Sequence, residues 1–157
     1  MVAEQTAGGY RGKLPPGPPV EPKPAKTDHA VLAVTLEENK LKWRANGSEN
    51  YRFNFQCSCF CLRDDTREAV VEVAQGAIFV ATYAGDGAAV DADLNDRYDT
   101  VDELFALLEE AVVSGAVQID AEFDPILGCP VSLYIDQDRR IADEEQWIAA
   151  LDVVLSL

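Results

Sequence analysis

The chain has 157 residues, of which 48% are hydrophobic, so it is long enough to form one domain with a buried core. Acidic residues outnumber basic residues by 28 to 13, and the net charge of -15 excludes nucleic-acid binding through a basic surface. No apolar run approaches the roughly 20 residues that a transmembrane helix needs, and none resembles the apolar core of a secretory signal.

Residues 1–28 are predicted to be a proline-rich, disordered tether, and residues 29–157 a single domain. Six of the eight prolines lie between Pro15 and Pro24, and four glycines lie close by. So few apolar side chains cannot offset the entropy that ordering the segment would cost. A spacer is the favoured interpretation, and a proline-rich ligand for an aromatic groove is the alternative.

The first half of the domain is predicted to be a helix followed by strands. Thr27 or Asp28 suits a helix N-cap, and Asn46 with Gly47 suits the end of that helix in a left-handed conformation. Aromatic and polar residues then alternate over residues 51–56, which indicates a half-buried strand that continues through residues 57–61. Further strands are expected at residues 69–73 and 78–83, separated by a turn at residues 75–76.

The second half repeats this order after a polar loop at residues 85–99. Thr100 and Glu103 have the spacing of a capping box, and the helix is expected to end at residues 114–115. Strands follow at residues 117–123 and 131–135, joined by a turn at residues 124–128. The periodicity of residues 147–157 fits either a last strand over 153–157 or a short helix.

This order predicts an α+β fold, with an antiparallel sheet and two helices on one face of it. Each half contains a helix and a β-hairpin, so the domain is interpreted as a duplicated helix–hairpin unit. Two strands alone are marginally stable in water, so the two hairpins are expected to join into one sheet.

Four cysteines are the first candidate functional residues. Cys57, Cys59 and Cys61 would share one face of a strand, and Cys129 lies in the second half. Structural disulfides are the favoured interpretation for an even number of cysteines in an exported domain. Free buried thiols and a metal site are the alternatives, although the spacing is not the usual one for zinc.

The acidic loop at residues 91–102 is a candidate calcium site, and no other cofactor is indicated. Oxygen-bearing side chains stand at positions 1, 3, 5, 9 and 12 of a calcium loop, which here are Asp91, Asp93, Asn95, Asp99 and Asp102. Against this, the sixth position is Asp96 where a sharp turn needs glycine, and the twelfth is Asp rather than Glu. The acids near residue 100 also suit a helix N-terminus.

No set of catalytic residues is found, so an enzyme of unrecognised type remains only an alternative. The single histidine, His29, lies at the tether boundary, and no phosphate-binding loop or hydrolase motif is present. Residues 86–145 hold 17 acids against three arginines. This acidic surface suits a basic protein or a cationic ligand as partner, unless it serves only solubility.

A series of short motifs resembles a known family. The chain carries, in this order, Trp43, YRF at 51–53, CFC at 59–61, VEVAQG at 71–76, TVDELF at 100–105, FDP at 123–125, GCP at 128–130 and Asp136. This series resembles an uncharacterised family of secreted and lipid-anchored bacterial proteins, classed as a domain of unknown function, over residues 36–145. The family usually has tyrosine where this chain has Phe123 and Cys129.

The resemblance implies a small α+β domain outside the cytoplasm and assigns no catalytic residue. Cys57 and Cys129 both depart from the family pattern, which implies that they are bonded to each other, with Cys59 and Cys61 bonded or reduced. The function expected from these observations is an exported, non-enzymatic binding module. A calcium-binding module that uses the 91–102 loop and an enzyme are the alternatives.

Overall fold

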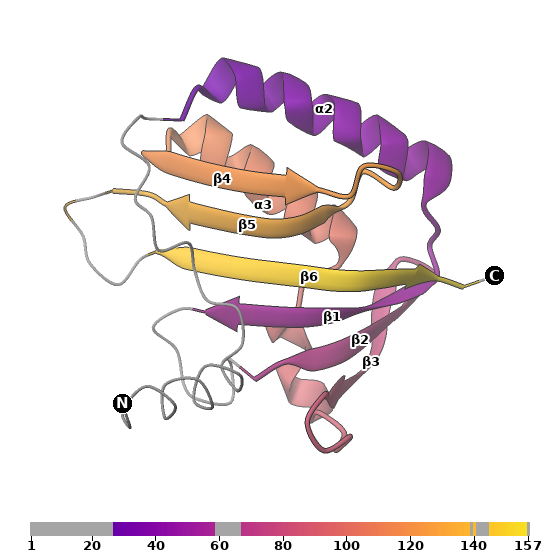
Figure 1. Cartoon of the computed structure of the whole chain (residues 1–157). Coiled ribbons are helices and arrows are strands. Elements are labelled where there is room, and N and C mark those ends of the chain that lie inside the picture. The colour runs from indigo at the N-terminus through magenta and orange to yellow at the C-terminus, as the bar shows by residue number, and fades with distance from the viewer. Residues whose placement is uncertain (1–26, 59–66, 139, 141–144, 157) are drawn as a thin grey trace, which may run out of the picture.

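The structure is a computed structural model, which describes residues 27–58, 67–138, 140 and 145–156. Figure 1 shows a sheet with helices on it. The elements, in chain order, are α2 (His29–Asn46), β1 (Tyr51–Ser58), β2 (Ala69–Ala74), β3 (Ala77–Tyr83), the 3-10 helix η2 (Ala92–Arg97), α3 (Val101–Ser114), β4 (Gln118–Phe123), β5 (Pro130–Asp136) and β6 (Gln146–Leu155).

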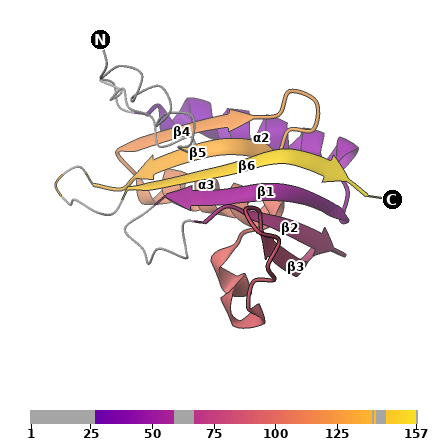
Figure 2. The same cartoon turned by 60° about the horizontal axis from the view of Figure 1, so that its bottom comes forward.

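The six strands form one antiparallel sheet in the order β3-β2-β1-β6-β5-β4. The last strand, β6, lies between β1 and β5 and so joins the two halves of the domain (Figure 2). The register of this join runs from Tyr51 opposite Leu155 to Ser58 opposite Trp147. The predicted α+β class with an antiparallel sheet is therefore confirmed.

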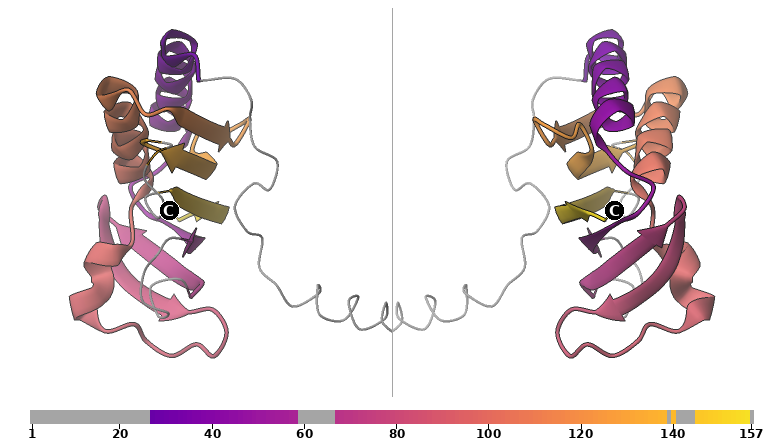
Figure 3. Two further views of the ribbon diagram at one scale, coloured as in Figure 1. Left: turned by 90° about the vertical axis from the view of Figure 1, so that its left-hand side faces the viewer. Right: turned by 90° about the vertical axis from the view of Figure 1, so that its right-hand side faces the viewer.

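Both helices lie on the same face of the sheet (Figure 3). Tyr51, Phe53 and Phe55 of β1 point to this face and are at most 4% exposed, as the alternation in the sequence requires. The rings of Phe53 and Phe55 lie 6.3 Å apart, and Phe55 packs edge-on against Tyr98 at 5.4 Å. The core therefore lies between this row of aromatic side chains and the helices.

Local signals set the limits of α3. The Thr100 hydroxyl accepts the N–H of Glu103, and the Glu103 carboxylate accepts the N–H of Thr100, which completes the predicted capping box. Gly115 ends the helix in the left-handed conformation, with φ of 76°. The buried stripe contains Leu104, Phe105 and Leu108.

The helix α2 runs along β4, the edge strand of the second half (Figure 1). Asp28 caps its start by accepting the N–H groups of Ala30 and Val31. At the other end, Gly47 has φ of -85°, so the expected left-handed cap is wrong. Glycine is required there for another reason, because a Cβ at this position would lie 2.5 Å from the Trp43 ring.

The Thr27 hydroxyl ties the start of α2 to the sheet edge. It donates to the Ile119 carbonyl at 3.1 Å and accepts the Ile119 N–H at 2.6 Å. His29 Nε2 donates to the Ala116 carbonyl at 2.7 Å, which gives the single histidine a structural role. Thr27 and Asp28 therefore belong to the domain and not to the tether. Residues 1–26 lie outside the described residues, so the tether itself stays a prediction.

The helix–hairpin repeat is corrected by the sheet, because each half supplies three consecutive strands rather than two. The sequence predicts either a last strand over residues 153–157 or a short helix, whereas the observed strand β6 begins earlier, at Gln146. Residues 147–150 are all buried, so no alternation marked the start of this strand. Neither helix in the described part of the chain has the length and apolar character of a membrane span.

Candidate functional site

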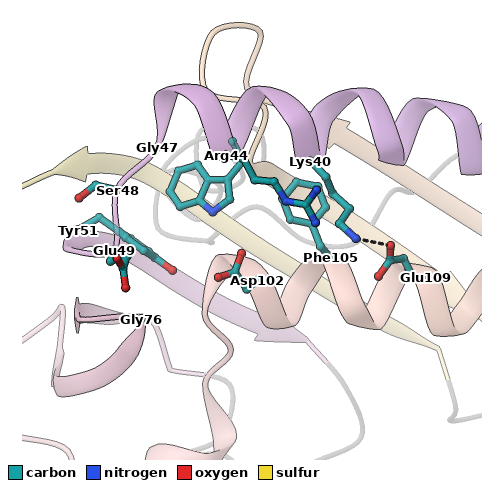
Figure 4. A pocket seen from close by; sticks show the side chains of 11 residues that line it. Lys40, Arg44, Gly47, Ser48, Glu49, Tyr51, Gly76, Asp102, Phe105 and Glu109 are labelled. Carbon is teal, nitrogen blue, oxygen red and sulfur yellow. Dashed lines mark hydrogen bonds and ion pairs between the residues drawn. The ribbon is translucent and has the colours of Figure 1, made fainter.

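A cleft of about 640 Å³ lies between α2, α3 and the beginning of β1 (Figure 4). The upper wall consists of Lys40, Trp43 and Arg44 from α2. The opposite wall consists of Asp102, Phe105 and Glu109 from α3. Gly47, Ser48, Glu49, Tyr51 and Gly76 close the end of the cleft, from the loop after α2, from β1 and from the β2–β3 turn.

Helical spacing places these side chains in the cleft. Residues three and four positions apart lie on one side of a helix, which is the separation of Lys40 from Trp43 and Arg44. The same spacing relates Asp102, Phe105 and Glu109 on α3. The spacing is present in the sequence, but the two helices face each other only in the tertiary structure, so the sequence alone does not indicate these residues.

The floor of the cleft is aromatic. The Trp43 and Tyr51 rings meet edge to face, with centroids 5.2 Å apart. The Tyr51 hydroxyl accepts the N–H of Val101 at 2.9 Å, so the floor is tied to the beginning of α3. Burial raises the pKa of the Tyr51 phenol well above its ordinary value, and the nearby carboxylates add to this effect. Tyr51 therefore stays a neutral hydroxyl and cannot act as a base.

Charges of both signs line the cleft. Lys40 Nζ and Glu109 Oε2 are 2.6 Å apart and form an ion pair across the two helices. Arg44 reaches from α2 into the cleft (Figure 4) and has no ion pair with any residue that the structure describes. Asp102 and Glu49 add two carboxylates toward the Gly76 end.

A second hollow of about 630 Å³ adjoins the cleft and shares Gly76 and Asp102 with it. We call it the acidic hollow. It is lined by Gly76, Ala77, Ile78, Asn95, Asp96, Tyr98, Thr100, Asp102 and Glu103. Three of these residues are acidic and none is basic. We call the cleft and the acidic hollow together the groove; charges of both signs line the cleft, and only negative charges line the acidic hollow.

In the described part of the chain, the acidic side chains of the candidate calcium loop are not gathered into a group that could hold a metal ion. Residues 92–97 are the 3-10 helix η2, and no group of three or more His, Cys, Asp or Glu side chains within the described ranges could hold a metal ion. Asp91 precedes this helix as its N-cap residue, and Asp93 and Asn95 lie within it. Asp102 lies on α3, where it lines the groove.

Asp99, the other residue of that loop, lies half-buried near Cys57 and Glu103. Burial and the charge of Glu103 raise the pKa of Asp99 to about 6. Burial and the charge of Asp99 raise the pKa of the Cys57 thiol to about 11. The Cys57 thiol is therefore protonated at neutral pH, which is unlike a reactive cysteine.

The expected Cys57–Cys129 disulfide is wrong. Cys129 has a free, fully buried thiol with its pKa raised by burial to about 11. Cys57 pairs with Ile148 of β6, which pairs in turn with Leu133 of β5, whereas Cys129 comes just before β5. At about 4.8 Å between neighbouring strands, Cys57 and β5 are roughly 10 Å apart across the sheet alone. A disulfide needs Cα atoms within about 7 Å. Cys59 and Cys61 lie outside the described residues, so their state stays a prediction.

The fold and the groove define a class: an α+β domain in which two helices on an antiparallel sheet border an open, charged groove. The chain belongs to DUF6174, a family of unknown function, whose model matches residues 35–155. The resemblance in the sequence is thus confirmed at the level of a family of unknown function. No curated protein and no solved structure matches the chain.

Proposed function

We propose that this protein is a non-enzymatic binding module that takes up a positively charged segment of a partner protein in its groove. The observation that carries the proposal is the acidic hollow, where Asp96, Asp102 and Glu103 line one concave surface without a lysine or arginine. Ile78 and Tyr98 supply apolar surface in the same hollow, against which the stem of a lysine or arginine side chain can pack.

Size and charge both support this proposal. Each half of the groove falls within the range of about 300–1,000 Å³ that is typical of binding pockets. The net charge of -15 attracts a basic partner at long range and speeds its association, an effect that salt weakens.

The setting of the proposed function is outside the cytoplasm. The proline-rich stretch at residues 15–24 supports this proposal, because such a spacer would hold the domain away from a surface. Cell fractionation of the host, with the protein expressed from its natural gene, tests the location. Recovery in the cytoplasmic fraction alone would contradict it.

Binding of a lysine-rich hexapeptide, measured by fluorescence anisotropy at low salt, tests the function. The double variant Asp96→Asn with Asp102→Asn removes two charges from the hollow and spares the capping residue Glu103. We expect it to weaken binding about tenfold or more. The control, Glu110→Gln with Glu122→Gln, removes the same charge from exposed positions away from the groove. Equal weakening by both double variants would show that net charge alone attracts the peptide.

A further inference from the structure

The two ends of the groove differ in charge, because the cleft is lined by charges of both signs and the acidic hollow only by negative ones. In the cleft, Lys40 is neutralised by Glu109 at 2.6 Å. Arg44 also lines the cleft, is exposed, and has no ion pair among the described residues. A guanidinium presents a planar fork of donors that matches a carboxylate. The cleft therefore offers one position for a compact anion, beside a hollow that accepts cations.

We propose that the groove recognises the C-terminal end of the partner chain, with the terminal carboxylate on Arg44 and basic residues upstream in the acidic hollow. This inference rests on the proposed function and adds the polarity of the bound segment. A ligand that fills both hollows, of about 640 and 630 Å³, is larger than a single amino acid. A short peptide end supplies both the size and the two opposite charges.

The lining of the cleft selects the kind of terminal residue. Trp43 and Phe105 also line the cleft, and an apolar or aromatic last side chain can pack against the small part of them that is exposed, 6% and 2% of the two residues. Glu49 and Asp102 line the same cleft and repel any further negative charge. The preferred ligand therefore carries one carboxylate, an apolar last residue, and lysine or arginine before it.

Arg44 also lies in the last turn of α2, where a cation is favourable to the helix dipole. That role would not depend on a ligand. Lys42 belongs to the same helix and is exposed, but it does not line the groove. Lys42→Gln is therefore the matched control for Arg44→Gln, since both remove one charge from the C-terminal half of α2. Thermal melts of both variants verify that each is folded.

The test compares two peptides of one sequence, four lysines followed by leucine and phenylalanine, that end in a free carboxylate or in an amide. The amide peptide has one more net positive charge, so the general field of this acidic protein favours it. Our proposal requires the opposite order, with the acid peptide binding about tenfold tighter than the amide. Arg44→Gln should abolish this preference and leave the affinity for the amide peptide within about twofold. Lys42→Gln should retain the preference.

Each outcome has one meaning. Equal binding of both peptides, or tighter binding of the amide, overturns the C-terminal inference and leaves the proposed function standing. Failure of both peptides to bind overturns the function and the inference together. A third peptide carries its single carboxylate on an internal glutamate and ends in an amide. If the third peptide binds as tightly as the acid peptide, Arg44 binds any carboxylate, and the inference is overturned in favour of an internal acidic residue.

Discussion

The two helices lie on the same face of one sheet, but they are attached to it in different ways. The helix α3 buries five residues, three of them the large side chains Leu104, Phe105 and Leu108. The helix α2 is longer but buries only Leu36, Asn39 and Trp43. Several of its apolar residues are more than half exposed, namely Val31, Val34 and Leu41. Hydrophobic burial thus holds α3, whereas α2 depends on a few polar and close-packed contacts.

The anchors of α2 lie along its whole length. Thr27 bonds to Ile119 at the start of β4, and Asn46 Nδ2 donates to the Ile126 carbonyl at 3.0 Å in the turn after β4. Between them, Gly128 approaches the Asn39 carbonyl so closely that a Cβ has no space. The edge of β4 is therefore covered by a helix, which protects it from pairing with another chain. The groove lies where this loosely packed helix faces the firmly packed one.

The largest effect is expected from the same change made on both helices. Leu108→Ala should lower the free energy of unfolding by about 3–4 kcal/mol, because the side chain is fully buried and the change leaves a cavity. Leu41→Ala should cost less than about 0.5 kcal/mol, since Leu41 is 56% exposed. Urea unfolding measures both. A similar cost for the two variants would contradict the difference between the helices.

A pair of glycines tests the close contact of α2 with the turn. Gly128→Ala should cost about 2–3 kcal/mol, because Gly128 has φ of 81° and the new Cβ would meet Asn39 and Lys42 of α2. Gly76→Ala is the control, with φ of 79° and no atom near the new Cβ, and should cost only about 1 kcal/mol. Equal costs in denaturant unfolding would mean that the contact with α2 contributes nothing.

The polar anchor at the start of α2 should have a smaller effect. Thr27→Ala removes both hydrogen bonds to Ile119 and should lower the free energy of unfolding by about 1–2 kcal/mol. Thr27→Ser keeps the hydroxyl and should retain most of that stability. Hydrogen exchange at the Ile119 amide reports the loss directly, since Thr27 accepts this N–H. Unchanged protection in Thr27→Ala would show that the anchor is not maintained in solution.

The smallest effect is expected just before α3. Asp99 has a pKa of about 6 in the folded protein against an ordinary 3.8, so the folded state holds its proton more tightly than the unfolded state. Its charge therefore costs stability above pH 6, and this cost disappears as the pH falls toward 4. Asp99→Asn should stabilise the protein by about 1 kcal/mol at pH 8, after discounting for partial exposure, and by almost nothing at pH 4. An equal effect at both pH values would exclude this cause.

Elements with local signals were predicted well. Thr100 and Glu103 fix the beginning of α3, and Gly115 fixes its end, because the cap groups lie within a few residues of each other. The strand at residues 51–58 followed from its alternation. The strand β6 was missed in its first half, because both faces of residues 147–150 are buried and the alternation disappears. The neighbours that bury residues 147–150 are brought there by the tertiary structure, and a short window of sequence does not contain this information.

Of the candidate site, the sequence predicted only the acidic charge and not the residues that form it. The loop pattern indicates Asp102 as a calcium ligand, whereas in the structure Asp102 lines the groove. Arg44 and Glu109 were not selected, because the groove forms only when α2, α3 and the β2–β3 turn meet. The disulfide between Cys57 and Cys129 failed for a related reason. The strand order, which no local pattern reveals, places β6 between β1, which carries Cys57, and β5, which Cys129 precedes.

The central position of β6 governs the order in which this fold can be completed. Its partners in β1 are distant in the chain, as for Ser58 and Trp147, which are roughly ninety residues apart. During synthesis, the first three strands and the second helix emerge before the strand that connects them to β5. We therefore expect a late, cooperative closure with the slow kinetics of high contact order. Until then, the backbone edge of β1 that pairs with β6 stays open beside the row of aromatic side chains on the face of the strand, which are features of a folding intermediate that a chaperone would recognise.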